Sequence, residues 1–550
     1  MRREGYPGAL ASFVVQAAVA DSGSGLAAGA AHIVAEASRR RTFAIISHPD
    51  AGKTTLTEKL LLYGGAVTEA GSVKARSGRR EARSDWMELE QRRGISISST
   101  ALRFEHRDIV FNLLDTPGHR DFSEDTLRVL AAADCAVILL DAARGVEAQT
   151  LKLFQVARAR GIPLITFVNK YDRPGMEPLE LIDHVEETLK LAAVPLTWPV
   201  GIPGDFRGVL DREGARFVRF TRTARGATMA PEEELSAEQA RREEGDVWST
   251  AVDELELLEA AGAAWDPARF ATGELSPVLF GSALSNFGVR HLLDTLIDIA
   301  PPPPGRPDAE GDMRALDAPF SSLVFKVQAN MDPRHRDRIA FMRICSGRFE
   351  RGMKAINART GKPIALAYAH ELFGQDRTVV DDAYPGDIVG IVNATDVLVG
   401  DTLYHDEPVR FGAIPTLAPE HFVTIHNRDP GRRKQFHKGL EQLDQEGVVH
   451  VLRRGTEPSP ILAAVGPLQF EVALERLSTE FGVTVSLDPR DWSVARRVGA
   501  QDAEAVKASR WGEILERADG TQLVVFRHDY GLQQLERELP DIVLDAMTAR

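Results

Sequence analysis

A segment between Phe43 and Leu62 carries the residues best suited to bind phosphate. A short apolar run, a polar loop and apolar positions at helical spacing follow one another there, which predicts a strand, a loop and a helix. The loop residues are Ser47, His48, Pro49, Asp50, Ala51, Gly52, Lys53, Thr54 and Thr55. In such a loop Gly52 would permit close backbone approach, Lys53 would bind the outer phosphates and Thr54 would bind Mg²⁺. Ser47 replaces the first glycine of the usual pattern, so we interpret the loop together with the motifs after it.

The second motif directly follows the apolar run that ends at Leu114. It consists of Asp115, Thr116, Pro117, Gly118 and His119. A carboxylate at a strand end suits Mg²⁺ held through water, and the Gly118 N–H can face a terminal phosphate. The alternative is an ordinary turn, since Asp, Pro and Gly are common turn residues. The position of this motif after the Lys53 loop favours the phosphate site.

The third motif selects the base. Asn169, Lys170 and Asp172 follow a buried apolar run, and Ser282, Ala283 and Leu284 follow another. The Asp172 carboxylate can accept from the ring N–H and the exocyclic amine of guanine, an edge that adenine lacks. We expect Asn169 to brace the loops, the Lys170 stem to lie along the base, and backbone N–H groups of the 282–284 segment to bind the guanine carbonyl oxygen.

Ser96, in an Arg-Gly-Ile-Ser segment, is a further candidate ligand of Mg²⁺ when a γ-phosphate is bound. Such a segment would become ordered with GTP and loosen after hydrolysis. An ordinary polar loop before a strand is the alternative, and these residues alone do not exclude it.

The elements that position these motifs alternate between strand and helix. Helices are predicted at 122–132 and 150–160, between strands predicted at Phe43–Ile46, Ile109–Leu114, Cys135–Leu140, Leu164–Val168 and Val278–Phe280. This alternation predicts an α/β domain, with a mainly parallel sheet and helices on both faces. Ligands of such sheets bind beyond the carboxyl ends of the strands, where all three motifs fall.

The domains that follow change in character. We assign 1–40 to a disordered or over-extended N-terminus, 41–302 to the GTPase domain, 303–310 to a proline-rich linker, 311–410 to a β-barrel, and 411–550 to an α+β, ferredoxin-like domain. The acidic stretch 231–260 contains a predicted helix with a solvated face. Between Lys326 and Lys362 there are ten Lys or Arg residues and three Asp or Glu residues, which suggests a local basic face or ordinary surface charge.

Composition limits the possible partners. The chain has 550 residues, a net charge of −14 and two cysteines. An acidic protein is not a general polyanion binder, so no DNA partner is expected. The cysteines fit small buried residues in a reducing compartment, and no apolar run is long enough to span a membrane.

On these motifs the chain resembles the translational GTPase family, and within it the release-factor branch. The resemblance rests on Arg93–Ser96, Asp115–His119 and the Ser47–Ala51 form of the loop, and on the stretches Ser84–Ile97, His119–Leu130, Phe325–Gly347, Tyr384–Ile388 and Gly466–Val472. It implies GTP and GDP as ligands, Mg²⁺, and His119 as the residue that orients the attacking water. It also implies a cytoplasmic protein, monomeric off the ribosome, that contacts ribosomal RNA and proteins and promotes departure of class I release factors.

Two other functions remain possible from the sequence. One is another ribosome-associated translational GTPase, and the other is a GTP-gated binding module with little turnover. An ATPase is disfavoured by Asp172. The resemblance shows no counterpart of the further C-terminal domain of elongation factor G, which we take as an argument against translocation.

Overall fold

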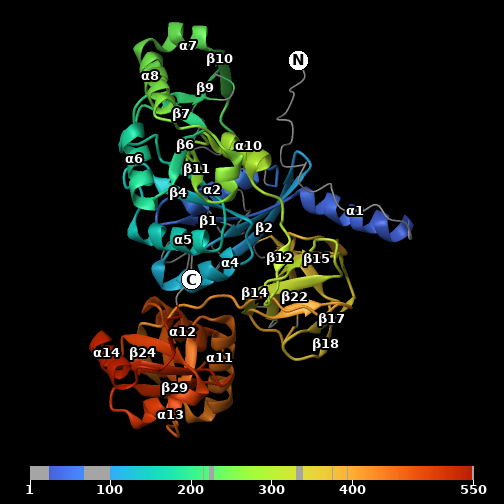
Figure 1. The fold of residues 1–550 in the computed structure, drawn as a ribbon, viewed down its shortest axis with the longest axis vertical. Helices are drawn as coiled ribbons and strands as arrows, with labels where there is room; N and C mark the ends of the chain where they lie inside the picture. Colours follow the sequence, from blue (N-terminus) through green and yellow to red (C-terminus); the bar gives the residue numbers. More distant parts are fainter. Residues whose placement is uncertain are drawn as a thin grey trace.

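The computed structural model describes residues 24–66, 99–212, 214, 216–221, 228–329, 338–373, 376–392 and 394–547. Three bodies follow one another along the chain, a large α/β body, a β-rich body and an α+β body (Figure 1). This arrangement confirms the predicted fold class, a GTPase-like α/β domain followed by a β-barrel and a ferredoxin-like domain.

The α/β domain is built on a seven-stranded sheet with strand order β2-β3-β1-β4-β5-β11-β6. Its strands are β1 (Arg40–Ser47), β2 (Thr100–His106), β3 (Ile109–Asp115), β4 (Cys135–Asp141), β5 (Leu164–Asn169), β6 (Ala192–Pro195) and β11 (Leu275–Phe280). All neighbouring pairs are parallel except β2 with β3. All five predicted strands are present, whereas β2 and β6, at the two edges of the sheet, were not predicted.

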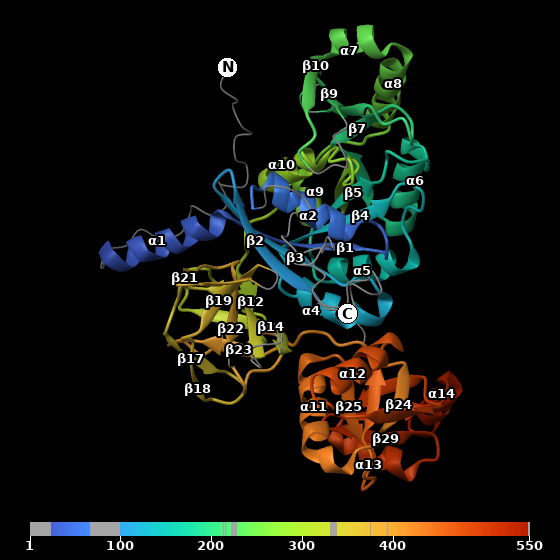
Figure 2. The same ribbon diagram turned by 180° about the vertical axis from the view of Figure 1, so that it is seen from behind.

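Helices cover both faces of this sheet (Figures 1 and 2). They are α2 (Lys53–Tyr63), α4 (Ser123–Leu130), α5 (Ala148–Ala159), α6 (Pro178–Leu189), α9 (Pro267–Ala271) and α10 (Val289–Ile299), with a short 3-10 turn η2 (Arg120–Phe122) before α4. Alternate residues of β4 enter different cores, Val137 and Leu139 one of them, and Ile138 and Leu140 the other. Both cores are apolar, which explains why the central strands are continuous hydrophobic runs.

An inserted subdomain lies between β6 and β11 at the far end of the α/β domain (Figure 1). It contains β7 (Thr197–Val200), β8 (Gly208–Asp211), β9 (Arg216–Phe220), β10 (Glu232–Ser236), α7 (Ala237–Glu244) and α8 (Asp246–Ala260). The acidic stretch is therefore part strand and part helix. Its charges are largely paired within the insert, as between Arg219 and Glu243 at 2.6 Å.

The β-rich domain is an eight-stranded sheet with strand order β18-β17-β23-β14-β15-β22-β19-β20, curled around its own core. Its strands are β14 (Ser321–Ala329), β15 (Arg338–Ser346), β17 (Lys354–Asn357), β18 (Pro363–Ala365), β19 (Ala369–Phe373), β20 (Asp376–Val379), β22 (Ile388–Val392) and β23 (Thr402–Tyr404). Two small pairs accompany it, β12 (Arg306–Pro307) with β13 (Met313–Arg314) and β16 (Phe349–Glu350) with β21 (Asp382–Ala383).

Two basic residues of this barrel, Lys326 and Arg343, contact the α/β domain and are buried. Arg343 is buried and contacts Asp134 at 2.6 Å. Lys326 is also buried and donates to Ser99. The suggestion of a basic face between Lys326 and Lys362 is therefore wrong for these two residues. A sequence count of charges cannot separate buried interdomain cations from exposed ones.

The third domain contains two ferredoxin-like units joined edge to edge, where the sequence suggested one. The first comprises β24 (His421–Asn427), α11 (Arg433–Glu446), β25 (His450–Arg453), β26 (Ile461–Ala464), α12 (Leu468–Thr479) and β27 (Val485–Arg490), with a 3-10 turn η4 (Pro430–Arg432) before α11. The second comprises β28 (Val494–Val498), α13 (Ala500–Ala508), β29 (Glu513–Arg517), β30 (Gln522–Phe526), α14 (Asp529–Glu538) and β31 (Leu544–Asp545). Each repeats the β-α-β-β-α-β order, and pairing of β25 with β29 makes one eight-stranded sheet.

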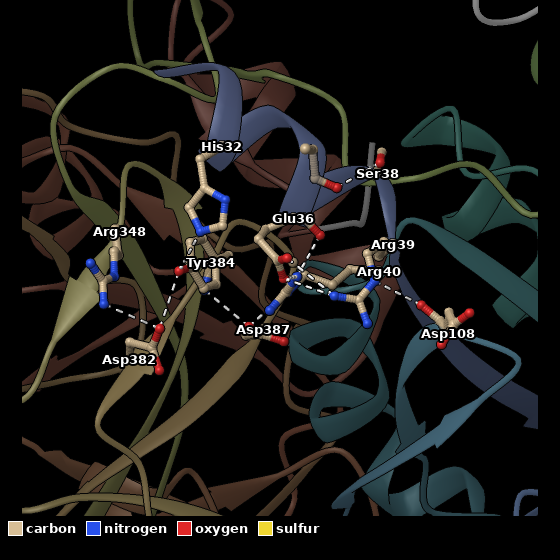
Figure 3. Close-up of polar contacts among 12 residues, drawn as sticks. His32, Glu36, Ser38, Arg39, Arg40, Asp108, Arg348, Asp382, Tyr384 and Asp387 are labelled. Carbon is tan, nitrogen blue, oxygen red and sulfur yellow. Dashed lines mark hydrogen bonds and ion pairs between the residues drawn. The ribbon is translucent and has the colours of Figure 1, made fainter. Parts of the chain in front are cut away.

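Helix α1 (Ser24–Ser38) lies in the segment for which disorder or over-extension was expected. Figure 3 shows the polar contacts of this helix: His32 Nε2 lies 3.1 Å from the Tyr384 hydroxyl of the barrel, and Glu36 pairs with Arg40 of β1 at 2.9 Å. Arg40 donates in turn to Asp387 at 2.8 Å. The helix, β1 and the loop before β22 thus meet at one joint.

Within the described ranges, we find no helix that combines the length and the apolar character needed to cross a membrane.

Candidate nucleotide-binding site

The phosphate loop connects the end of β1, at Ser47, to the start of α2, at Lys53. Gly52 has φ +99°, a left-handed conformation that favours glycine. A Cβ atom at this position would lie 2.5 Å from Asn169 Nδ2. Both the backbone and the neighbouring amide therefore require glycine at the helix start, where anions bind in such folds.

Three predicted residues gather beside this loop. Lys53 and Asp115 are both buried, and Lys53 Nζ lies 3.5 Å from Asp115 Oδ1. In the part of the chain that the structure describes, Lys53 Nζ has no hydrogen-bond partner. A Cβ atom at Gly118 would lie 3.9 Å from the same Nζ and 3.8 Å from the Cα of Pro49. A buried ammonium without a hydrogen-bond acceptor is suited to bind a phosphate oxygen.

Asn169 links two of the predicted loops. Its Nδ2 donates to the Ala51 carbonyl at 2.7 Å, and its Oδ1 accepts from the Ala283 N–H at 2.8 Å. Asn169 is buried at the end of β5, so a single side chain fixes the phosphate loop relative to the loop after β11.

Asp172 lies beside the loop that follows β11. Its Oδ2 accepts from the Ser285 hydroxyl at 3.2 Å. Its Oδ1 is buried and has no hydrogen-bond partner among the described residues. Leu284, also from this loop, is half exposed. An unpaired buried carboxylate oxygen is costly, and paired N–H donors of a base would satisfy it.

An additional pair, Asp141 and Lys170, was not among the predicted interactions. Lys170 has φ +64°, and its Nζ donates to Asp141 at 2.9 Å and to the Asp50 carbonyl. Burial raises the pKa of Asp141, but the hydrogen bonds from Lys170 and from the Ala143 N–H outweigh burial and lower it. Asp141 ends β4, so the rule that strand ends carry function could have found it.

His48 is a buried imidazole within the phosphate loop. Burial lowers the pKa of His48, although the nearby carboxylates of Glu147 and Asp141 act in the opposite direction. The uncharged ring therefore adds no cation to the loop at neutral pH. Over the described ranges neither of its ring nitrogens has a hydrogen-bond partner.

His119 begins the turn that leads into α4 and is about one-third exposed. Its Nδ1 lies 3.2 Å from the Asp121 backbone nitrogen and 3.3 Å from Asp121 Oδ1. It directly follows Gly118, where a Cβ atom would lie 3.9 Å from Lys53 Nζ, and its ring lies edge-on against Phe122.

The remaining predicted residues lie around this centre. Thr54 and Thr55 are half buried in the first turn of α2, Thr116 and Pro117 are buried, and the Thr116 hydroxyl donates to the Ile45 carbonyl at 2.6 Å. Ser282 is buried, and its N–H donates to the Phe287 carbonyl at 2.9 Å. Ser96 lies outside the described residues, so the prediction for it stays a prediction.

Comparison with known families supports this reading of the three domains. The family "Elongation factor Tu GTP binding domain" matches residues 38–302, "Elongation factor G domain 2" matches 319–406, and "Class II release factor RF3, C-terminal domain" matches 411–536.

Whole-length relatives agree with the family matches. Peptide chain release factor 3 of Gloeobacter violaceus is 50% identical over 519 residues, which cover 93% of this chain and 98% of the relative. The protein of the same name from Microcystis aeruginosa is 48% identical, with 92% and 95% covered. A solved structure from Thermus thermophilus shares the fold, with a TM-score of 0.66 at 23% identity, and the match covers 88% of this chain and 71% of that one.

Proposed function

Because this chain belongs to the peptide chain release factor 3 family, we propose that it hydrolyses GTP in response to the ribosome and thereby promotes the departure of class I release factors. Family membership makes it a guanine-nucleotide-binding translational GTPase that acts in termination and interacts with the ribosome. What we propose beyond family membership is that ribosomes stimulate hydrolysis and that hydrolysis is linked to the departure of class I release factors.

The observation that supports the nucleotide assignment is a pair of buried polar atoms, each without a hydrogen-bond partner among the described residues, in loops joined by Asn169. Lys53 Nζ, which lacks a hydrogen-bond partner among the described residues, would bind phosphate. Asp172 Oδ1, which lacks one within the same ranges, would bind guanine. Asn169 hydrogen-bonds to both loops and holds the two subsites together. One GTP molecule would satisfy both groups at once.

Mg²⁺ fits the donors at the phosphate end. Thr54 would contribute its hydroxyl and Asp115 its carboxylate through water, with Ser96 as a third oxygen donor, and such oxygen ligands match the preference of the ion. When bound, the metal would neutralise charge on the phosphate oxygens. Lys53 would contribute its positive charge there, and Asp172 would select the base.

We propose His119 as the residue that orients the attacking water. Its position after Gly118, beside the Lys53 loop, supports this role. Contact with ribosomal RNA would complete the placement of the side chain, so hydrolysis without ribosomes should be slow. We further propose that the protein is monomeric off the ribosome and acts in the cytoplasm.

The test is GTP hydrolysis with and without terminated ribosomes, together with the departure rate of a fluorescent class I release factor. We expect strong stimulation by ribosomes, loss of that stimulation in His119→Ala with GDP binding retained, and faster departure of the labelled factor. Hydrolysis without faster departure would indicate another translational GTPase. Intact GTP binding without hydrolysis on ribosomes would indicate a GTP-gated binding module.

A further inference from the structure

The turn that carries His119 lies against the third domain. Asp121 is almost fully buried, and its Oδ2 accepts from the Leu468 N–H at 2.8 Å. Phe122 packs against Leu468 and Val472 in a small apolar cluster. Leu468 is the first residue of α12 and belongs to the stretch Gly466–Val472, whose contribution the nucleotide site does not explain.

The close approach of the two domains depends on Gly466. A Cβ atom there would lie 2.0 Å from the Asp121 Cγ and 2.3 Å from its Oδ1. Glycine therefore leaves the space in which the carboxylate reaches the start of α12. The position of the Asp121 side chain therefore depends on contacts with the third domain as well as on its own turn.

Two groups of Asp121, its backbone N–H and its carboxylate, lie beside Nδ1 of His119, and they require different protonation states of that nitrogen. The Asp121 N–H, 3.2 Å from Nδ1, requires an unprotonated Nδ1. The Asp121 Oδ1, 3.3 Å from Nδ1, requires Nδ1 to carry a proton. The same oxygen also lies 3.6 Å from Arg120 Nε, a weaker contact of a largely exposed side chain.

The choice between these contacts determines what the other ring nitrogen can do. With Nδ1 bound to the N–H, a neutral ring carries its proton on Nε2, which then cannot accept a hydrogen bond from water. With Nδ1–H bound to the carboxylate, Nε2 is the free acceptor and can orient a water through its proton. A carboxylate behind a histidine selects the tautomer in this way in other hydrolytic sites.

We propose that Asp121 is a positioning residue for GTP hydrolysis. Its carboxylate, held by the Leu468 N–H of the third domain, orients His119 and favours the tautomer with the proton on Nδ1. Contact of the third domain with Asp121, through Gly466 and Leu468, then affects the rate of GTP hydrolysis in the α/β domain. This inference rests on the proposed role of His119 and deepens it.

The first test is Asp121→Asn, with Asp183→Asn on exposed α6 as the matched change. The asparagine oxygen can still accept from Leu468, but its amide cannot accept from Nδ1–H. We expect ribosome-stimulated kcat to fall about 10- to 100-fold, by analogy with loss of the carboxylate that orients a metal-bound histidine. GDP affinity and ribosome binding should not change, and Asp183→Asn should behave as the unaltered protein.

A spectroscopic readout separates orientation from a merely structural role. In a nitrogen-15 histidine spectrum, with the His119 signals assigned through His119→Ala, the proton should reside mainly on Nδ1 in the unaltered protein. It should shift toward Nε2 in Asp121→Asn. An unchanged tautomer together with unchanged kcat would overturn the proposal.

The second test addresses the contribution of the third domain. Gly466→Ala should lower kcat because the added methyl group displaces the Asp121 carboxylate. In an Asp121→Ala background the same substitution should cause no further loss, since the colliding atoms are absent. Gly499→Ala, in the same domain with open space around it, is the control.

The outcomes distinguish this inference from the proposed function. If ribosomes do not stimulate the unaltered protein, the proposed function fails. If they do, and His119→Ala abolishes stimulation while Asp121→Asn and Gly466→Ala leave it intact, only the role of Asp121 is refuted. Additive losses in the Gly466 and Asp121 double variant would refute the coupling through the third domain.

Discussion

Gly52 and Asp172 show how single residues define the proposed nucleotide site. Glycine is required at position 52 for two reasons: its φ is +99°, and a side chain there would collide with Asn169. Asp172 contributes chemistry, through an oxygen that the described part of the protein leaves without a hydrogen bond. Substitution of each residue should therefore impair nucleotide binding in a different way.

Gly52→Ala should abolish tight nucleotide binding. The new methyl group would displace Asn169, and the left-handed backbone would add about 1–2 kcal/mol of strain. Gly262→Ala is the matched control, because Gly262 has φ +92° with open space around it. Titration with fluorescent GDP should show weakened binding for Gly52→Ala alone, whereas urea unfolding should show that both substitutions lower the free energy of unfolding. Equal GDP affinity in the two variants would contradict the role given to the Asn169 contact.

Asp172→Asn should weaken guanine binding without unfolding the protein. Asparagine replaces one acceptor with a donor, which faces the N–H groups of the base, so we expect a loss of about 2 kcal/mol or more. The same change at exposed Asp183 should leave GDP affinity intact. Isothermal titration measures both, and a normal affinity of Asp172→Asn would place the base elsewhere.

At the scale of elements, α4 joins the α/β domain to the third domain through buried charge. Glu124 of α4 pairs with Arg128 at 2.8 Å and lies 3.2 Å from His450 of β25. Arg128 also donates to the Glu446 carbonyl at 3.0 Å. Burial raises the pKa of Glu124, but the charges of Arg128 and His450 outweigh it and lower the pKa to about 2.

This lowered pKa predicts a pH-dependent contribution to stability. A carboxyl group whose pKa falls on folding stabilises the folded state above its unfolded pKa, near 4.5, and loses that contribution as pH falls through about 2. Glu124→Gln should therefore lower the free energy of unfolding by about 3 kcal/mol at pH 7. Urea unfolding at several pH values should show the deficit shrinking between pH 4.5 and pH 2. The exposed Glu536→Gln is the control, and a pH-independent deficit would contradict the electrostatic explanation.

At the scale of the whole molecule, the barrel is attached to the α/β domain by buried polar contacts and a shared apolar core. Phe325, Phe341 and Ile388 of the barrel belong to the same core as residues of the central sheet. The Gly386 carbonyl accepts from the Thr42 hydroxyl at 2.7 Å, and a side chain at Gly386 would collide with Pro303. The stretch Tyr384–Ile388 thus joins the two domains. It contacts the start of β1, whereas the phosphate loop follows the end of that strand.

Breaking this joint should loosen the two domains while leaving the nucleotide site intact. Asp387→Ala removes the acceptor of buried Arg40 and of the Tyr384 N–H, while Arg40 keeps its ion pair with Glu36, so we expect a loss of about 1–3 kcal/mol for the buried donors left without an acceptor. We expect faster proteolysis between the domains and a larger radius of gyration in solution scattering, with unchanged GDP affinity. Asp381→Ala, which removes an exposed ion pair with Arg351, should change none of these.

Much of this organisation follows from local sequence. The phosphate loop, the strands that precede each motif and the α/β class are determined locally, because apolar runs and glycine positions fix elements over short distances. The edge strands β2 and β6 were not predicted, since they lie outside the continuous buried runs. The second ferredoxin-like unit was also missed, because its strands are short and their composition alone does not distinguish them from loops.

The sequence by itself predicts the chemistry of the proposed site, namely which residues would bind phosphate, metal and guanine, because this prediction depends only on residue type and order. Tertiary structure alone decided which charges are buried between domains, such as Arg343, and which distant groups meet, such as Asp121 and Leu468. The physical reason is that burial and hydrogen bonding depend on contacts between residues hundreds of positions apart. No local pattern in the chain encodes those contacts.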